Sequence, residues 1–383
     1  MTPAARLSAA IAVLDRILAG EGAEQALTGW GRASRFAGSG DRAAVRDLVF
    51  DALRCRRSFA ALGGGLTGRG LILGGLREAG ADVSALFTGE GHAPPPVAPD
   101  EGGHPPEGNE ALDCPDWLVP PLAASLGEDF APVLRAMRHR APVFLRVNAA
   151  RCGVAEAGAA LAADGISTRP VSGVNFALEV TENARKIQSS RAYADGLVEL
   201  QDAASQAVVE GLPLSDGMKV LDYCAGGGGK TLAMAARARL RLFAHDAAPG
   251  RMRDLPARAT RAGARVTLCE NPDRSAPYDL ILADAPCSGS GSWRRDPQGK
   301  WALTPARVAE LTTIQAGILD RIGPMVAPGG WLGYATCSLL DVENASQIKA
   351  FQSRTPGWTL AAQHRFTPLT GGDGFFLALL RRN

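Results

Sequence analysis

Lysine is scarce in this sequence: only five of its 41 basic residues are Lys, and the rest are Arg. With so much Ala and Gly beside it, this bias is more typical of a GC-rich genome than of a nucleic-acid partner. The seven cysteines are odd in number, widely spaced and without a CxxC pair. This pattern excludes a disulfide framework and a structural zinc site. The five histidines are scattered, so we expect no metal centre.

Long hydrophobic runs are also missing. No stretch approaches the ~18 consecutive apolar residues of a membrane span. The first twenty residues carry Asp15 within their apolar stretch and lack the layout of a signal peptide, so we expect no secretion. Apolar residues make up 46% of the chain and charged residues 21%, as in globular proteins. We therefore expect a cytoplasmic monomer with free thiols and no membrane partner.

The 383 residues leave room for two or three domains. Residues 1–88 show helical spacing of apolar side chains, with Asp41 as a candidate N-cap. Residues 89–112 are rich in Pro and Gly and predict a linker or disordered loop. Residues 113–204 predict a small α+β module in β-α-β-β order. Residues 205–383 form the remaining domain.

Strands and helices alternate strictly from about residue 218. This alternation predicts a parallel sheet with helices on both faces, an α/β fold of the Rossmann-like kind. Two further strands near the end predict an antiparallel pair at the sheet edge. The expected strands are KVLDYCA, RLFAHD, RVTLC, DLILADAP and GWLGYATC, followed by WTLAAQHRF and GFFLALLRR.

A glycine-rich turn follows the first of these strands, where ligands bind in open α/β sheets. Its sequence is Cys224-Ala225-Gly226-Gly227-Gly228-Gly229-Lys230-Thr231. A P-loop requires Gly where Cys224 stands, and a dinucleotide fingerprint requires Gly or Ala where Thr231 stands. A methyltransferase needs only a tight glycine turn beneath the methionine part of its cofactor, and this turn meets that need.

Acidic residues follow the second and third strands. Asp246 is placed to accept hydrogen bonds from both hydroxyls of a ribose, as in other nucleoside-binding α/β folds. This position favours a nucleoside ligand but does not choose between NAD and S-adenosylmethionine, and Asp246 could also cap the next helix. Glu270, after the third strand, is a weaker candidate for a place near an adenine.

Two cysteines follow the fourth and fifth strands. Asp284 and Cys287 lie in DAPCSGSG and Cys337 lies in YATCS. If these strands are neighbours, two thiols and a carboxylate share one pocket, which core packing does not explain. A thiolate that adds to carbon 6 of a pyrimidine turns carbon 5 into a nucleophile that can accept a methyl group. The placement alone allows either cysteine to be that thiolate.

The motifs CAGGGGKT, DAPCSGSG and YATCS together resemble the RNA cytosine-C5 methyltransferases of the RsmB/Nop/Sun family. WRRDPQGKW at 293–301, LQDAASQ at 200–206 and PVFLRVN at 142–148 are similar to further family motifs. SGDRAAVRDLVFDALR at 39–54 resembles the NusB-type helical domain of the RsmB branch. The resemblance covers most of the chain outside the linker. It implies a NusB-like RNA-binding domain at 1–88 and an RRM-like module at 113–204.

The resemblance implies a role for each candidate residue. Cys337 is the nucleophile, Cys287 assists release, and Asp284 contacts the cytosine or the methionine end of S-adenosylmethionine. The cofactor site is lined by the segment from Cys224 to Lys230, by Asp246 and by Glu270. The implied substrate is small-subunit ribosomal RNA. Two departures stand out: Gly226-Gly227 replaces the family's Ala-Pro, and Glu270 stands where the family more often has Asp.

Arg294, Arg295, Lys300 and Trp301 interleave positive charge with an aromatic ring, which suits RNA contact, although a solvated loop has the same pattern. Two other functions compete. A P-loop-like NTPase would use the Gly-Lys-Thr ending, with Asp284 as a magnesium ligand. A catalytically inactive RNA-binding assembly factor would use the fold alone, but it has no need of Cys287 and Cys337.

Overall fold

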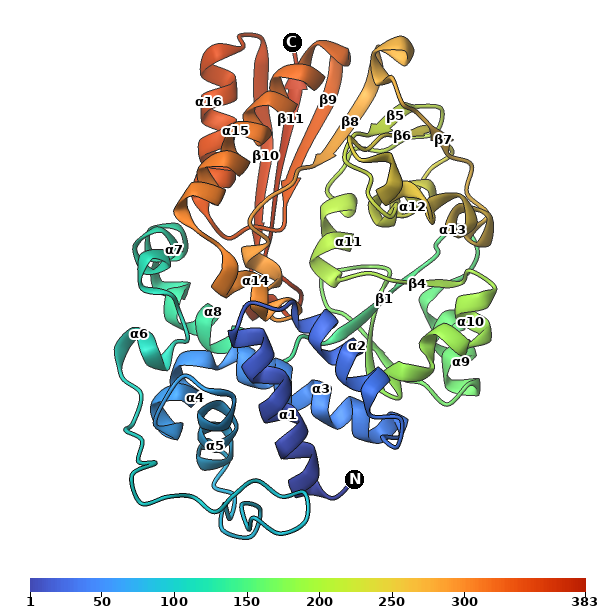
Figure 1. Ribbon diagram of the computed structural model, residues 1–383. Helices are drawn as coiled ribbons and strands as arrows, with labels where there is room; N and C mark the ends of the chain where they lie inside the picture. The colour runs from blue at the N-terminus through green and yellow to red at the C-terminus, as the bar shows by residue number, and fades with distance from the viewer. The chain divides into compact units, whose positions relative to one another are not determined.

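Figure 1 shows the computed structural model, which describes residues 1–383. The chain divides into two compact units. The first unit comprises 1–140 together with 293–302, and the second comprises 141–292 together with 303–383. The sequence placed a boundary at 112/113 instead. Residues 113–140 are helical and group with the first unit.

Helices build the first unit around one apolar core, in which Leu14, Val49 and Leu71 are fully buried. The helices are α1 (Pro3–Leu18), α2 (Ala23–Ala33), α3 (Ser39–Arg54), α4 (Arg56–Gly63), α5 (Gly68–Glu78), α6 (Gly108–Ala111), α7 (Val119–Leu126), α8 (Phe130–Met137) and α14 (Pro297–Ala302). No single helix of the chain is long and apolar enough to cross a membrane; only the bent pair α4 and α5 passes on length and composition.

Helix α3 begins three residues earlier than the sequence indicated. Its N-cap is Gly38, and Asp41 lies in the first turn, where its carboxylate accepts a hydrogen bond from the Gly38 amide at 3.2 Å. The same carboxylate binds the Arg6 guanidinium at 2.9 Å. The expectation that Asp41 is the N-cap was therefore wrong, because the helix extends back to Ser39 and Asp41 caps it from within.

The Pro/Gly-rich segment 89–112 is irregular up to α6 and is anchored by hydrogen bonds. The Glu101 carboxylate pairs with Arg69 through two hydrogen bonds, and this pairing lowers the pKa of Glu101 to about 2. The His104 amide donates to the Ala61 carbonyl at 2.9 Å. These bonds hold the segment against the helices of its own unit.

The second unit contains a small antiparallel sheet of strand order β2-β3-β1-β4. The sequence predicted these four strands and the helix between the first two. Their bounds are β1 (Val143–Val147), α9 (Val154–Ala163), β2 (Ser167–Pro170), β3 (Ala177–Glu182), α10 (Arg191–Ala194) and β4 (Val198–Leu200).

The main sheet of the second unit has the strand order β10-β11-β9-β8-β5-β6-β7. Strands β5 to β9 pair in parallel, whereas β11 pairs antiparallel with both β9 and β10. The predicted α/β fold with an antiparallel edge is confirmed. The strands are β5 (Lys219–Asp222), β6 (Arg241–Ala244), β7 (Thr267–Leu268), β8 (Tyr278–Asp284), β9 (Val326–Thr336), β10 (Trp358–Phe366) and β11 (Phe375–Arg382).

Helices cover both faces of this sheet because its strands bury side chains on alternating sides. Ile281 packs in the core that includes residues of α15 and α16, and Leu282 packs in the core that includes residues of α11 and α12. Figure 1 shows α15 and α16 side by side. The helix bounds are α11 (Ala203–Glu210), α12 (Gly229–Ala235), α13 (Leu255–Ala262), α15 (Pro305–Ile322) and α16 (Ala345–Arg354).

Parallel pairing brings the carboxyl ends of β5, β6, β8 and β9 to one edge of the sheet. The residues that follow these four strands are those that the sequence singled out for chemistry.

Candidate active site

Two thiols meet at this edge. Strands β8 and β9 are hydrogen-bonded neighbours, with Asp284 opposite Ala335 in the register. The loops that follow them place the sulfur of Cys287 3.3 Å from the sulfur of Cys337. Both thiols are free and only partly buried, so they are open to a ligand. The sequence predicted this convergence from the strand order.

A buried carboxylate joins the two cysteine loops. Glu343 is fully buried, and its carboxylate accepts hydrogen bonds from the Ser288 amide at 2.8 Å and the Ser288 hydroxyl at 2.5 Å. It also accepts from the hydroxyl of Ser338, the residue after Cys337, and from the Gln315 amide at 3.0 Å. One side chain therefore fixes the residues that follow both cysteines.

Further hydrogen bonds fasten the loops directly to each other. The Gly291 amide donates to the Cys337 carbonyl at 2.9 Å, and the Leu339 amide donates to the Ser290 hydroxyl at 2.8 Å. The Tyr334 hydroxyl donates to the Glu343 carbonyl at 2.7 Å. The distance between the two sulfurs is thus set by a connected polar network.

Contact with the other sulfur raises the pKa of the Cys287 thiol well above its usual range, and burial and the charge of Glu343 act in the same direction. A thiol that keeps its proton can donate a hydrogen bond to a neighbouring thiolate. With the two sulfurs 3.3 Å apart, one cysteine of the pair can therefore stay protonated and donate to the other as a thiolate.

The glycine turn between β5 and α12 needs its glycines. Gly226 and Gly228 have φ of +52° and +80°, which other residues rarely adopt. A Cβ on Gly228 would lie 2.1 Å from a methyl carbon of the buried Leu255. The turn therefore packs closely against Leu255, and an added side chain at Gly228 has no room.

Asp246 supports this turn from the end of β6. Its buried carboxylate accepts hydrogen bonds from the Gly226 amide at 3.0 Å and the Ala248 amide at 2.9 Å, and it pairs with Arg251 at 3.1 Å. It does not cap α13, which begins at Leu255. A carboxylate fixed beside a glycine turn has lone pairs left for ribose hydroxyls, so these residues fit S-adenosylmethionine.

The side chains of Lys230 and Thr231 both bind carboxylates of the protein itself. The Lys230 ammonium pairs with Asp284 at 2.6 Å and lies over the Phe375 ring. The fully buried Thr231 hydroxyl donates to Asp222 at 2.6 Å. A P-loop NTPase needs both side chains for phosphate and magnesium. The NTPase alternative is therefore not supported.

The remaining cofactor candidates lie at the same edge. Cys224 is half-buried, and burial raises the pKa of its thiol. The Ala225 amide binds the His245 carbonyl at 2.9 Å, which ties the turn to β6. Glu270 follows β7 and is solvent-exposed.

The predicted RNA-binding segment is placed differently from the expectation. Arg294 and Lys300 are buried, and the Lys300 ammonium donates to the Arg54 carbonyl at 3.2 Å. The Trp301 indole donates to the Leu53 carbonyl at 2.7 Å. These three side chains pack within the helical unit and are not offered to a phosphate, because α14 lies on α3. Arg295 is exposed.

Sequence reasoning missed Glu343 and Gln315. Neither lies in a recognisable motif, and a buried glutamate on a short helical turn gives no local signal. A Glu-Asn pair shortly after a cysteine-bearing strand end is the only hint, since Asn344 binds the Ser338 carbonyl at 2.9 Å.

Comparison with known proteins identifies the family. The family model "16S rRNA methyltransferase RsmB/F" matches residues 209–381, and that of the ferredoxin-like domain of RsmF/B-like methyltransferases matches residues 114–187. The chain is 35% identical over 282 residues to ribosomal RNA small subunit methyltransferase B of Citrobacter koseri. That alignment covers 70% of this chain and 66% of the relative, just under two thirds of its length.

Solved structures share the fold. The crystal structure of PH0851 aligns with a TM-score of 0.77 at 22% identity and covers 100% of this chain and 99% of that one. NSun6 from Pyrococcus horikoshii with SFG aligns with a TM-score of 0.62 at 17% identity, covering 70% of this chain and 98% of that one. With its sequence motifs, its strand order and these matches, the chain belongs to the RsmB/F family of methyltransferases, and its cofactor is S-adenosylmethionine.

Proposed function

We propose that this protein methylates carbon 5 of a cytosine in small-subunit ribosomal RNA. The observation that carries the proposal is the pair of thiols 3.3 Å apart at the ends of neighbouring parallel strands. Methyl transfer to an amine needs no thiol, whereas carbon 5 of a pyrimidine must first be activated by a nucleophile. A catalytically inactive assembly factor has no use for such a pair.

Cys337 acts as the nucleophile. Its thiolate adds to carbon 6 of the cytosine, the ring electrons shift, and carbon 5 becomes nucleophilic. Bound S-adenosylmethionine supplies the electrophilic methyl group. After transfer, carbon 5 loses its proton and the Cys337–carbon 6 bond breaks, which restores the thiolate and the aromatic ring. The supporting feature is the contact between the two sulfurs, through which a Cys287 thiol can donate a hydrogen bond to the Cys337 thiolate.

Cys287 then assists release of the product, and Asp284 binds the cytosine or the methionine end of the cofactor. The position of Asp284 supports this role, since it ends β8 three residues before Cys287 and pairs with Lys230. The turn from Cys224 to Lys230, together with Asp246 and Glu270, holds the cofactor.

The RNA is bound by parts outside the catalytic sheet. Residues 1–88 act as a NusB-like RNA-binding domain, 89–112 as a connection and 113–204 as an RRM-like module; Arg295 adds an exposed positive charge. The relative from Citrobacter koseri is named for small-subunit ribosomal RNA, and this supports the choice of substrate. The protein works as a monomer in the cytoplasm, where that RNA is made.

Cysteine variants test the division of labour. Cys337→Ala cannot form a covalent bond to RNA and is expected to be inactive. Cys287→Ala can still attack but releases poorly, so it should accumulate as a protein–RNA adduct that survives denaturing electrophoresis. The double variant should lose the adduct, because the adduct depends on Cys337.

Cys152→Ala is the matched control, since this thiol lies in the small sheet domain and should leave activity and gel pattern as in the wild type. A stable adduct from Cys337→Ala and none from Cys287→Ala would reverse the two roles. Absence of methyl transfer to carbon 5 by the wild type would overturn the function.

A further inference from the structure

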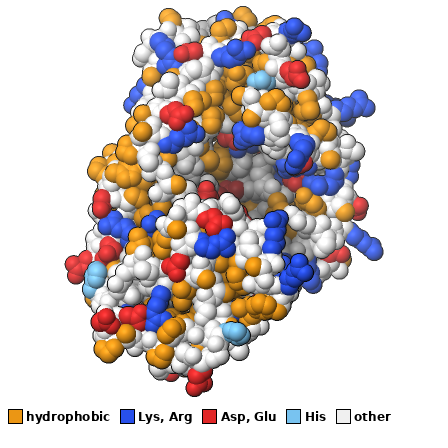
Figure 2. Space-filling model, viewed as in Figure 1, with side chains coloured by type: hydrophobic (Ala, Val, Ile, Leu, Met, Phe, Trp, Pro, Cys, Tyr) orange, Lys and Arg blue, Asp and Glu red, His pale blue; other side chains and the backbone are white.

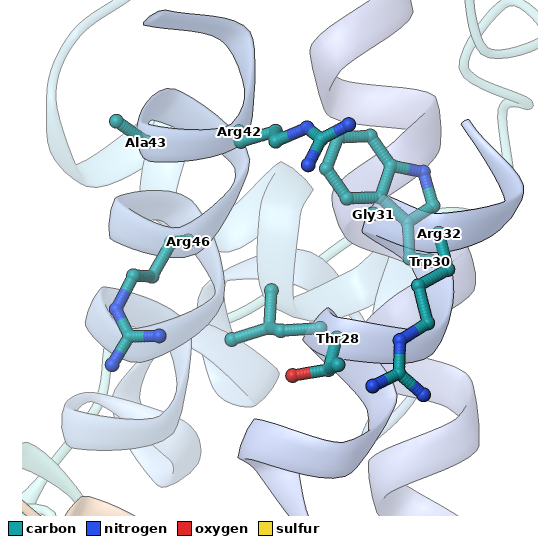
Figure 3. Close-up of a pocket in the computed structure, with 8 residues that line it drawn as sticks. Thr28, Trp30, Gly31, Arg32, Arg42, Ala43 and Arg46 are labelled. Carbon is teal, nitrogen blue, oxygen red and sulfur yellow. The ribbon is translucent and has the colours of Figure 1, made fainter. Parts of the chain in front are cut away.

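A hollow of about 430 Å³ lies between α2 and α3 in the helical unit. It has an apolar floor and a positively charged rim. In Figure 3, the side chains of Arg46 and Arg32 stand on either side of it and that of Arg42 reaches toward the Trp30 ring. The volume is more than large enough to admit a planar ring system of the size of a nucleobase.

The positive charge at this rim is not neutralised by protein carboxylates. Arg32 and Arg35 are exposed and make no ion pair. The Arg42 guanidinium donates to the Ala37 carbonyl at 3.1 Å, which fixes its position without neutralising its charge. Arg46 alone is paired, with Glu24.

The nearby carboxylates are occupied elsewhere. Asp41 binds Arg6 and the amino group of Met1, and Asp47 binds Arg140. Arg32 and Arg42 at the hollow, and Arg35 in the turn that follows α2, therefore face solvent with no acidic side chain paired to them. An anionic ligand is what this rim attracts.

Aromatic side chains accompany the charge. Phe36, in the turn between α2 and α3, is 77% exposed, so its ring is accessible for stacking on a base. Trp30 is half-buried and lines the hollow. Two aromatic rings among unpaired arginines are suited to stacking bases while the charges hold the phosphates.

We propose that this surface, formed by Trp30, Arg32, Arg35, Phe36 and Arg42, binds a single-stranded stretch of RNA. One unstacked base enters the hollow beside Trp30, another stacks on Phe36, and the three arginines bind the intervening phosphates. The inference rests on the proposed RNA substrate and names where part of that RNA is held.

Other anionic partners fit less well. An acidic peptide supplies charge but no flat rings for Phe36 and Trp30. A double-stranded RNA supplies phosphates, but its bases are stacked inside the helix and cannot enter the hollow. The combination of exposed rings and unpaired arginines therefore favours an unpaired strand.

Salt dependence separates the roles of these residues. Binding of a labelled polyuridylate strand by the full chain is measured by fluorescence anisotropy over a range of salt concentrations. Arg32→Ala and Arg35→Ala should each reduce the slope of log K against log salt by about 0.7, because each removes one phosphate contact. Phe36→Ala should weaken binding about tenfold and leave the slope unchanged, because stacking releases no counterions.

Arg274→Ala is the matched control, since this arginine is also exposed but lies in the second unit, outside the parts of the chain proposed to bind RNA. It should leave both affinity and slope unchanged. Polyglutamate and a matched duplex serve as competing polyanions. The proposal is overturned if Arg32→Ala, Arg35→Ala and Phe36→Ala bind the strand as the wild type does. It is also overturned if polyglutamate binds as tightly as RNA with the same dependence on Phe36.

The outcome is independent of catalysis. Methyl transfer to small-subunit ribosomal RNA is measured in parallel with the wild type. If the wild type transfers no methyl group while Phe36→Ala still loses strand binding, the proposed function fails and the binding surface stands. If methyl transfer is present but no surface variant alters strand binding, the surface fails and the proposed function stands.

Discussion

The Glu343 carboxylate accepts hydrogen bonds from the loops that carry Cys287 and Cys337, although it does not bind either sulfur. A buried carboxylate is costly unless several donors satisfy it, and here Ser288, Ser338 and Gln315 provide them. The charge also helps to raise the pKa of Cys287. We therefore regard Glu343 as a positioning residue that fixes the spacing of the thiols.

The residues that sequence analysis could find are those whose position in a motif determines their chemistry. Cys287 and Cys337 follow apolar strands, and parallel neighbours must end side by side. Glu343 was not predictable, because its partners come from a loop 55 residues earlier and from a helix 28 residues earlier. Only the folded chain brings these donors together.

The buried Asp222 carboxyl should make the stability of the protein depend on pH. Complete burial raises the pKa of this carboxyl to about 7, and the Thr231 hydroxyl only partly offsets this. Between the usual carboxyl pKa and this value, the folded state binds the proton and the unfolded state does not. The wild type should therefore lose about 1.4 kcal/mol of stability per unit as the pH rises toward 7, and then level off.

Asp222→Asn should remove this dependence, since an amide oxygen can still accept from Thr231 without carrying a charge. The measurement is denaturant unfolding at several pH values between 5 and 8. Parallel curves for the wild type and the variant would contradict the raised pKa.

At the scale of the element, the sequence predicted a tight glycine turn after β5 but not which of its glycines is required. Four consecutive glycines between a strand and a helix indicate a close backbone approach. The sequence could not say which glycine is sterically required, because Leu255 lies 27 residues further along the chain. The structure assigns that requirement to Gly228.

Gly228→Ala should weaken S-adenosylmethionine binding and lower stability. Its Cβ would meet Leu255 at 2.1 Å in addition to straining a φ of +80°. The strain should cost about 1–2 kcal/mol and the overpacking about 1–3 kcal/mol more. Calorimetry with the cofactor and thermal unfolding measure the two effects.

Gly217→Ala is the control for the strain alone. This glycine has a φ of +87°, and the space that an added Cβ would occupy is open. It should lose stability by the smaller amount and bind the cofactor normally. Equal losses in both variants would show that contact with Leu255 does not matter.

The segment 293–302 shows why a charge pattern can mislead. Interleaved Trp, Arg and Lys indicate an RNA-facing loop, but Lys300 and Trp301 donate to carbonyl groups at the end of α3. Those acceptors lie about 250 positions earlier in the chain. The Arg294 carbonyl in turn accepts from the Arg54 guanidinium. Burial also lowers the pKa of Lys300 to about 8, which is the opposite of what a phosphate would do.

At the scale of the whole molecule, the distribution of charge alone does not indicate where a ligand binds. Figure 2 shows basic and acidic side chains interspersed with apolar ones over the face in view, consistent with a net charge of +2. The alternation of strands and helices did predict the catalytic sheet. The division into units was harder, because the first unit contains ten residues from a distant part of the sequence.

Deletion of residues 1–110 should separate cofactor binding from catalysis. Asp246 and the glycine turn lie in the second unit, so the truncated chain should still bind S-adenosylmethionine in calorimetry. Residues 293–302 would lose the Leu53 and Arg54 carbonyls that Trp301 and Lys300 bind. We expect cleavage in this segment by limited proteolysis and loss of methyl transfer.

Full-length Lys300→Met is the companion variant, because it removes the buried charge while the helices remain. It should stay resistant to protease. A truncated chain that resists cleavage at 293–302 would mean that this segment does not depend on the helical unit.

The chain is synthesised from its N-terminus. Because residues 293–302 belong to the first unit, the order of synthesis affects when that unit can be completed. Helices α1 to α8 leave the ribosome long before Lys300 and Trp301 are made. The carbonyl groups at the end of α3 therefore lack their final partners until strand β8 has also emerged. Translation of the helical unit begins before that of the catalytic unit, yet the helical unit is completed only when most of the catalytic unit already exists.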